Sequence, residues 1–426
     1  MIIWLLVLAC NPVDDLSVEI SPEMPTIATV RWSTEDAEPG YVEVEKDGGV
    51  WLRTPLSAAA TDHEVQLRGL AASTDYSVRV VLPDRNDRRS RRETLTTGAL
   101  PNSLPTIQVA GNAGRDLFMA TPVFPGGGAA VILDGDGNIV WFSEEETDQE
   151  FYRVRPSVDG TGVYYSLTDV SDPASLNPDA RIVWVSWDGT QREEIAVPGM
   201  AHDFVQLPDG TLAALIFEVR ADLVGNAILE IGADGTEQVV WSAFDCFDPT
   251  EIPEGRHPLT GGWTFANALD YDADADAYTV GLFGFESIAR VDRASGRCPW
   301  VLGGLGATIE TDDPFSRQHQ FQVLDDGDVL VFDNAGGSDS RAVEYDLSTD
   351  PATAQQIFEV GLFVPVLGDV HRFRDGQTLV TWSFSGQIDL FDQSGDAIFT
   401  LNLPLGDVFS YNTVQTSLYV DDPAAE

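Results

Sequence analysis

The chain has 426 residues, of which 43% are hydrophobic, and a formal net charge of −45 at pH 7. This length allows two or more domains with sizeable cores, and the apolar content excludes a wholly disordered protein. The negative charge makes nucleic acid and anionic lipid headgroups poor partners, because both are themselves anionic. Lys46 is the only lysine, so nearly all basic side chains are arginines, whose planar fork suits tetrahedral oxyanions.

The N-terminus predicts export. Residues 1–9 are apolar but too few to span a bilayer as a helix, and Val-Leu-Ala-Cys at 7–10 resembles the lipobox of bacterial lipoproteins. We therefore expect residues 1–15 to be a lipoprotein-type signal and tether. The protein would then be secreted to the cell envelope or extracellular, and lipid-anchored through Cys10. Because no basic residue precedes the apolar run, the alternative is a misassigned start codon or an uncleaved stub.

The other two cysteines depend on the same prediction. If Cys10 is lipidated, Cys246 and Cys298 remain as an even pair in an oxidising compartment. They could form a disulfide or stay as two separate free thiols.

Residues 16–97 predict a small β-sandwich. Short alternating runs, such as Thr29-Val-Arg-Trp32, are separated by turn signals, which is typical of antiparallel sandwiches. Residues 65–80 resemble the late strands of a fibronectin type III domain, with Trp32 in the early core strand and Tyr76 as the corner tyrosine. His63 is expected on the surface. We expect this domain to be a spacer or docking module.

A linker is predicted over 98–110, where prolines and a glycine interrupt regular structure. Just before it, residues 85–92 hold five arginines, which we expect to form a local ion-pairing surface. A nucleic-acid site there is disfavoured because no aromatic residues are interleaved. The second domain is expected over 111–420, followed by an acidic tail at 421–426.

The second domain predicts almost only strands and turns. Asp-Gly turns between hydrophobic alternations recur at 134–135, 188–189, 234–235, 326–327 and 375–376. Units of about 40 to 50 residues account for the segment as six repeats, which is β-propeller spacing. The predicted fold class is therefore all-β: a six-bladed β-propeller preceded by a small fibronectin III- or Ig-like β-sandwich.

Three of the five histidines stand at hairpin entries. His202 and His319 each lie eight residues before the turn glycine, whereas His371 lies five before Gly376. Because the innermost strands of a propeller converge on a central channel, we expect these histidines to approach one another. Imidazole and nearby arginine suit nucleophilic or acid–base chemistry on an anionic group. The alternative is that the histidines only fix the ends of the hairpins.

The propeller segment also carries a series of longer motifs, at 97–105, 201–204, 267–272, 287–292, 300–304, 317–322, 326–334 and 375–379. Together they resemble bacterial aryl sulfotransferases of the PAPS-independent kind. The resemblance implies a six-bladed propeller that moves a sulfuryl group from a phenolic sulfate ester to a phenol. It also implies a sulfohistidine intermediate and no nucleotide cofactor.

The resemblance assigns roles to individual residues. It implies that His319 is the catalytic nucleophile and that His202 is a second pocket histidine, which binds or protonates the leaving oxygen. The candidate substrate-binding residues are Arg317, His371, Arg372, Phe265, Phe283 and Asn267.

Two of these positions depart from the family pattern. The third family histidine falls in a Trp-x-His-x-Asn motif, where this chain has Phe265, and the pocket arginine corresponds to Phe283. Neither phenylalanine can donate to a sulfuryl oxygen. The alternative function is therefore a catalytically impaired propeller that binds an aromatic ligand as a cell-surface module. A purely structural adhesion module is a third hypothesis.

No cofactor is predicted, since we find no nucleotide-binding loop, serine-centred elbow or CxxC metal cluster. The acidic loops 270–276 and 134–138 are expected to be hairpin turns. A structural calcium ion is left open, although the first loop has Ala275 and Gly281 where a calcium loop needs glycine and glutamate. His257, in a glycine- and proline-rich loop, could cover the channel mouth or simply be exposed. The expected partner is a small phenol, aryl sulfate or aromatic ligand, with membrane contact only through the lipid anchor.

Overall fold

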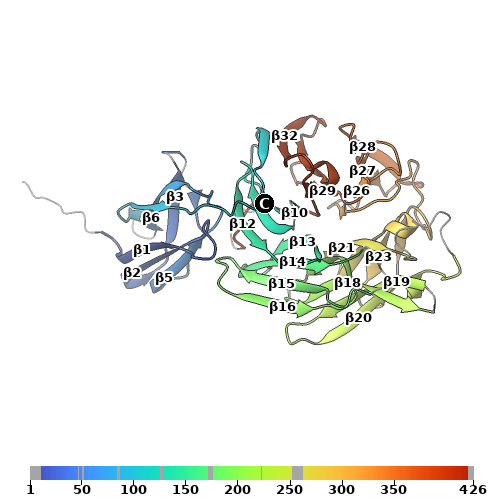
Figure 1. Ribbon diagram of the computed structural model, residues 1–426, viewed down its shortest axis with the longest axis horizontal. Coiled ribbons are helices and arrows are strands. Elements are labelled where there is room, and N and C mark those ends of the chain that lie inside the picture. The colour runs from blue at the N-terminus through green and yellow to red at the C-terminus, as the bar shows by residue number, and fades with distance from the viewer. Residues whose placement is uncertain are drawn as a thin grey trace, which may run out of the picture.

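The computed structural model describes residues 11–46, 48–49, 52–83, 87–124, 128–170, 176–221, 223–251 and 262–420. Within these ranges the chain is almost entirely antiparallel β-structure, which confirms the all-β prediction. Figure 1 shows a smaller N-terminal region beside a larger region whose sheets follow one another round a ring. In the described part of the chain, no helix is long and apolar enough to cross a membrane.

The N-terminal region consists of two antiparallel sheets that enclose one core, which contains Trp32 and Tyr76. Val13 is buried in this core, so the domain begins inside the segment predicted as a tether. One sheet has the order β1-β2-β5 and the other β4-β3-β6-β7, with β8 also paired to β6. The strands are β1 (Asp14–Ile20), β2 (Ala28–Glu38), β3 (Tyr41–Lys46), β4 (Leu52–Arg53), β5 (Ala60–Leu67), β6 (Asp75–Leu82), β7 (Arg88–Arg89) and β8 (Glu93–Thr96).

His63 is buried, so its predicted surface position was wrong. It lies directly across from Trp32 in the β2–β5 ladder, and the two rings stack with centroids 4.5 Å apart. Its ring nitrogens lie 2.9 Å from Ser57 Oγ and 2.9 Å from the Ala60 carbonyl. This histidine is therefore a hydrogen-bonded core residue.

The predicted arginine-rich surface is present over its described part. The four described arginines of residues 85–92 lie within 4 Å of glutamates on neighbouring strands, in the pairs Arg88–Glu38, Arg89–Glu43, Arg91–Glu93 and Arg92–Glu45. These contacts hold strands of the N-terminal sheet together.

The larger region contains six antiparallel sheets. Strand β9, which includes residues 108–110 of the predicted linker, completes the last sheet, and β33 and β34 complete the first, so the two ends of the region share sheets. In chain order the sheets comprise β10 (Phe118–Phe124), β11 (Ala129–Asp134) and β12 (Ile139–Glu144) with β33 (Val408–Phe409) and β34 (Thr413–Gln415); β13 (Glu150–Pro156), β14 (Gly162–Thr168), β15 (Arg181–Ser186) and β16 (Arg192–Ala196); β17 (Met200–Gln206), β18 (Leu212–Arg220), β19 (Leu223–Ile231) and β20 (Glu237–Ser242); β21 (Ala266–Asp272), β22 (Ala277–Leu282), β23 (Ser287–Asp292) and β24 (Trp300–Leu302); β25 (Phe321–Val323), β26 (Val329–Asp333), β27 (Arg341–Asp346) and β28 (Thr353–Phe358); and β29 (Asp369–Arg372), β30 (Thr378–Trp382), β31 (Gln387–Phe391) and β32 (Ala397–Asn402) with β9 (Gln108–Gly111).

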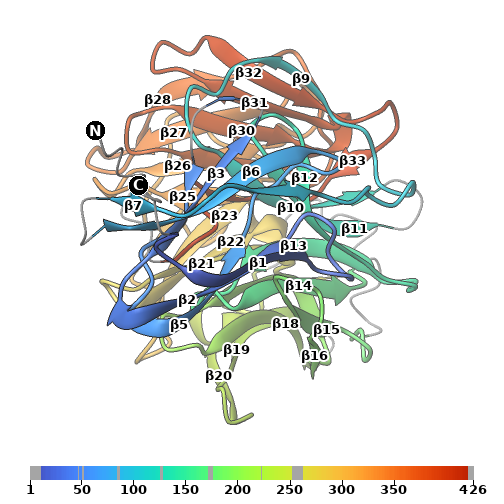
Figure 2. The same ribbon diagram turned by 90° about the vertical axis from the view of Figure 1, so that its left-hand side faces the viewer.

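Side chains of the two regions pack against one another, and Figure 2 shows the N-terminal strands in front of the larger region. Met24 and Ile27 belong to the same buried cluster as Trp187. The Arg68 guanidinium lies 4.6 Å from the centre of the Trp187 ring and 5.3 Å from that of Tyr419. Burial lowers the pKa of Arg68 to about 10. The N-terminal region is therefore packed on the larger one.

A disulfide joins Cys246 and Cys298, whose Cα atoms are 5.9 Å apart. Cys246 ends the short helix α1 (Ala243–Cys246) after β20, and Cys298 precedes β24. The bond therefore connects two neighbouring sheets.

Candidate active site

The inner strands bring His202 and His319 into one aromatic cluster. His202 lies in β17, and its ring centroid is 5.2 Å from that of Tyr152 and 4.9 Å from that of Phe265. His319 lies just before β25, 5.4 Å from Phe283. All five side chains are buried. The structure therefore places the two histidines in one cluster. Each of them contacts one of the two phenylalanines that depart from the family pattern.

Asn334 fixes the protonation of His319. Its Nδ2 donates to the carbonyl oxygens of Val364 (2.8 Å) and Leu367 (2.9 Å), so Oδ1 is the atom that faces His319. The distance from His319 Nδ1 to Asn334 Oδ1 is 2.8 Å. Since an amide oxygen only accepts, Nδ1 carries the proton and Nε2 carries the lone pair. The role of Asn334 was missed in the sequence because its three partners are 15, 30 and 33 residues away.

His202 has the same tautomer. Its Nδ1 lies 3.1 Å from the Ala266 carbonyl oxygen, which can only accept a hydrogen bond. Burial lowers the pKa of His319 to about 4. Burial and, secondly, the neighbouring His319 lower the pKa of His202 to about 3. Both imidazoles are therefore neutral at pH 7 and can use Nε2 as a nucleophile or base.

A buried ion network lies next along the inner strands. Arg153 donates through Nε and Nη2 to the two oxygens of Asp203, each at 3.0 Å, and through Nη1 to Asp369 at 3.0 Å. Gln320 donates to Asp203 at 3.1 Å. All four side chains are buried.

The arginines of this network favour the ionised form of its two aspartates. Burial opposes ionisation of Asp203, but the guanidinium groups of Arg153 and Arg155 outweigh burial and lower its pKa. Burial raises the pKa of Asp369 to about 6, although Arg153 opposes that shift. Asp203 is therefore the firmly ionised partner of Arg153.

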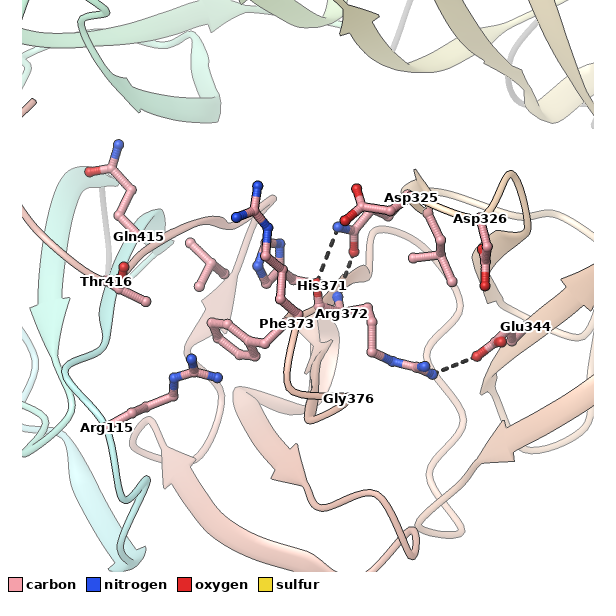
Figure 3. A pocket seen from close by; sticks show the side chains of 14 residues that line it. Arg115, Asp325, Asp326, Glu344, His371, Arg372, Phe373, Gly376, Gln415 and Thr416 are labelled. Carbon is pink, nitrogen blue, oxygen red and sulfur yellow. Dashed lines mark hydrogen bonds and ion pairs between the residues drawn. The ribbon is translucent and has the colours of Figure 1, made fainter. Parts of the chain in front are cut away.

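His371 and Arg372 do not join the histidine pocket. They line a separate cavity of about 640 Å³ together with residues of the turns at Asp326 and Gly376 (Figure 3). His371 lies five residues before its turn glycine, whereas His202 and His319 lie eight before theirs. This difference of three residues corresponds to a distance of about 10 Å along a strand, at about 3.3 Å per residue. His371 therefore faces the turn end of the channel, and its predicted place beside His202 and His319 is corrected.

The side chains around that cavity are largely engaged with one another. Arg372 donates to Glu344 (2.6 Å), Gln356 (3.1 Å) and Thr378 (2.7 Å), so it cannot replace a donor lost near His319. Burial and the nearby Arg115 lower the pKa of His371 to about 4.

Arg317 is the arginine that adjoins the histidine pocket in the chain. Its carbonyl oxygen lies 3.2 Å from His319 Nδ1, and its backbone has a left-handed φ of 55°. The side chain is half-buried, and its guanidinium has no hydrogen bond or ion pair within the described ranges. A half-buried guanidinium with no carboxylate partner among the described residues is a candidate for binding an anion.

The remaining predicted residues have structural positions or lie outside the described ranges. Asn267 is buried, and its Nδ2 donates to the Gln318 carbonyl at 2.8 Å. Its Oδ1 has no partner among the described residues. His257 and Cys10 are not among the described residues.

The acidic loops have local roles in turns. Asp272 Oδ1 accepts from the backbone N–H groups of Asp274 and Ala275, both at 3.0 Å. Asp134 accepts from Asn138 in the same way. No group of three His, Cys, Asp or Glu side chains in the described part of the chain could hold a metal ion.

Comparisons with known proteins give distant structural similarities. No curated protein matches the sequence. A protein of unknown function from Bacteroides caccae shares 16% identity, with a TM-score of 0.46 over 70% of this chain and 98% of that one. TolB from Acinetobacter baumannii shares 12%, with a TM-score of 0.38 over 81% of each chain. Virginiamycin B lyase from Staphylococcus aureus shares 11%, with a TM-score of 0.40 over 70% of this chain and 99% of that one.

The family comparison covers most of the chain. Residues 106–399 match the family model described as Arylsulfotransferase (ASST). This segment contains both pocket histidines, both phenylalanines beside them and the ion network. The chain therefore belongs to the arylsulfotransferase (ASST) family.

Proposed function

We propose that the protein transfers a sulfuryl group from a phenolic sulfate ester to a phenol through a sulfohistidine on His319. Family membership implies aryl sulfates and phenols as substrates. The observation that carries the mechanism is the hydrogen bond from His319 Nδ1 to Asn334 Oδ1, because it leaves the Nε2 lone pair free in a neutral ring.

The proposed reaction has two balanced steps. In the first, His319 Nε2 attacks the sulfur of the aryl sulfate, an N–S bond forms, and the S–O bond to the ring breaks, so that a phenolate leaves. In the second, the oxygen of a second phenol attacks the same sulfur, the N–S bond breaks and returns its electron pair to His319, and the phenolic proton passes through His202 Nε2 to the phenolate released in the first step. Arg317 supplies charge stabilisation to the sulfuryl oxygens in both steps.

A burst experiment tests the covalent intermediate. Protein lacking residues 1–10 is mixed with 4-nitrophenyl sulfate without any acceptor, and nitrophenol release is followed on the millisecond to second scale. We expect a burst of about one equivalent per protein, and a sulfated peptide containing His319 by mass spectrometry at neutral to alkaline pH. A steady release without a burst and without a labelled peptide would argue for direct transfer and against the sulfohistidine.

The acid limb of the pH profile should lie unusually low. Because burial lowers the pKa of His319 to about 4, we expect kcat/KM to stay constant down to about pH 5 and to fall with a midpoint near 4. Initial rates with 4-nitrophenyl sulfate and phenol measure it, with tryptophan fluorescence at each pH as the control for folding. A midpoint near 6.5, the value of an ordinary histidine, would contradict the prediction.

The same shifts affect stability. In the folded protein the pKa values of His202, His319 and His371 are about 3, 4 and 4, and in the unfolded chain each group is near 6.5. Unfolding therefore takes up protons below pH 6.5. The contribution of neutral histidines is complete above pH 6.5 and is lost as the pH falls from there towards 4.

A second candidate function is binding of an aromatic ligand without catalysis. It is favoured by Phe265 and Phe283, which place rings, not donors, against the two histidines. A pocket of this kind would bind a phenol or an aryl sulfate by ring contacts and turn it over slowly.

Phe265→His separates the two candidates. Phe265 has a left-handed φ of 44°, a region in which histidine is more common than phenylalanine, so the substitution suits the backbone. If the pocket is catalytic, a new donor should raise the transfer rate by about 100-fold. Phe265→Leu, which removes the ring without adding a donor, should give no gain. An unchanged or lower rate in Phe265→His would favour the binding candidate.

We also propose the finer points of architecture and location. The six sheets are proposed to be the blades of a six-bladed propeller, supported by the shared sheets at the two ends of the region. The N-terminal domain is proposed to be fibronectin III-like, supported by the 2.8 Å hydrogen bond from the Ala71 N–H to Tyr76 Oη. The disulfide supports an oxidising compartment, and thus export with lipidation at Cys10.

A further inference from the structure

The connection between β28 and β29 is an uncharged segment beside the histidine pocket. Residues 360–368, Val-Gly-Leu-Phe-Val-Pro-Val-Leu-Gly, contain no charged or polar side chain, although the chain has 69 acidic residues. We refer to residues 360–367 as the apolar lip.

Side chains of the lip divide into inward and outward sets. Val364 is fully buried, and Leu362 is partly buried against the same core. Val360, Phe363 and Val366 are 36%, 47% and 41% exposed. The buried set anchors the lip, and the exposed set forms an apolar surface that the fold itself does not cover.

The lip is attached to the catalytic histidine. The Nδ2 atom of Asn334 donates to the carbonyls of Val364 and Leu367, and its Oδ1 accepts from His319 Nδ1. The same amide therefore holds the lip and the imidazole.

The lip also reaches the pocket through Leu367. This residue follows the exposed Val366 in the chain and packs against the buried cluster that contains Phe265, Phe283 and Tyr411. The lip therefore runs from its exposed side chains to the aromatic cluster around the histidines.

We propose that the lip binds an apolar substituent of the aryl substrate, so that the protein prefers phenols with an alkyl or polycyclic extension over small or charged ones. This inference rests on the proposed function for the position of the phenolic oxygen at His319. Uncovered apolar side chains are stabilised by an apolar group, and a charged group there would find no partner in the lip.

A homologous series tests the proposal. 4-Nitrophenyl sulfate is the constant donor, and the acceptors are phenol, 4-ethylphenol, 4-butylphenol and 4-hexylphenol. For the unmodified protein we expect kcat/KM to rise about two-fold per added methylene. Phe363→Ser/Val366→Ser should flatten this dependence. The matched control is Val158→Ser/Val239→Ser, which changes two exposed side chains in the β13–β14 turn and on the outer strand β20 and should keep it.

The outcomes separate the lip from the reaction. Transfer without a chain-length dependence, or with the same dependence in the lip variant, contradicts apolar binding at the lip but not the proposed sulfuryl transfer. If the protein shows no transfer, the dissociation constants of the same alkylphenols, measured by tryptophan fluorescence, replace the rates. If the dissociation constant then depends on chain length and only the lip variant loses this dependence, the result supports apolar binding at the lip and contradicts the proposed sulfuryl transfer. A dimer on gel filtration that the lip variant converts to a monomer overturns the proposal in favour of contact between copies.

Discussion

We expect the His319→Ala protein to transfer sulfuryl groups at least ~1,000-fold more slowly than the unmodified protein, because removal of the nucleophile leaves no covalent route. His371→Ala is the matched control. Both histidines have a pKa of about 4, but His319 is buried beside Phe283, whereas His371 is half-buried and lines the other cavity. The His371→Ala rate should stay within about three-fold of the unmodified rate.

Initial rates of nitrophenol release with phenol as acceptor measure both variants. Thermal unfolding of each variant, recorded beside the rates, controls for loss of folded protein. Equal losses in His319→Ala and His371→Ala at equal folded fractions would contradict the assignment. A His319→Ala protein that retains more than a tenth of the rate would do the same.

The spacing to the turn glycine also marks site residues that were not predicted from the sequence. Tyr152 lies eight residues before Gly160, as His202 and His319 do before their glycines, and it contacts His202. Arg153, Asp203, Gln320 and Asp369 all lie seven residues before a turn glycine, and they form the ion network. An offset of eight residues from the turn glycine therefore marks the histidine pocket, and an offset of seven marks the ion network. Residues at the same offset in equivalent inner strands lie at the same depth.

Other features depend on pairings that a single sequence does not contain. His63 is buried because β5 pairs with β2 in the register that places it opposite Trp32. The role of Asn334 depends on carbonyl groups in the connection that begins two strands later, after β28 has completed the same sheet. His371 has the right residue type and a hairpin entry, but its different offset moves it along the strand to another cavity. Residue type and motif were thus weaker guides than offset from the turn.

Arg153→Met should lower the free energy of unfolding by about 3–5 kcal/mol at pH 7, because it leaves Asp369 buried without its cation and Asp203 with only Arg155, at 3.6 Å. Arg153 is 3% exposed and its two partners are 0% and 9% exposed, so solvent cannot replace the lost contacts. Urea unfolding followed by tryptophan fluorescence measures the loss. Arg192→Met is the control: Arg192 pairs with Glu145 at the surface with 38% of its side chain exposed, and its loss should cost about 1 kcal/mol or less.

The pH dependence distinguishes unpaired carboxylates from a packing defect. Burial raises the pKa of Asp369 to about 6 in the folded protein, and removal of Arg153 should raise it further. A raised pKa in the folded state means that the folded variant binds more protons than the unfolded chain, so the deficit of Arg153→Met should shrink as the pH falls from 7 to 5. The triple variant Arg153→Met/Asp203→Asn/Asp369→Asn should be more stable than Arg153→Met alone at pH 7, because neither carboxylate is left buried without Arg153. A deficit that does not change with pH, together with a triple variant less stable than the single one, would show that Arg153 acts through packing and not through its charge.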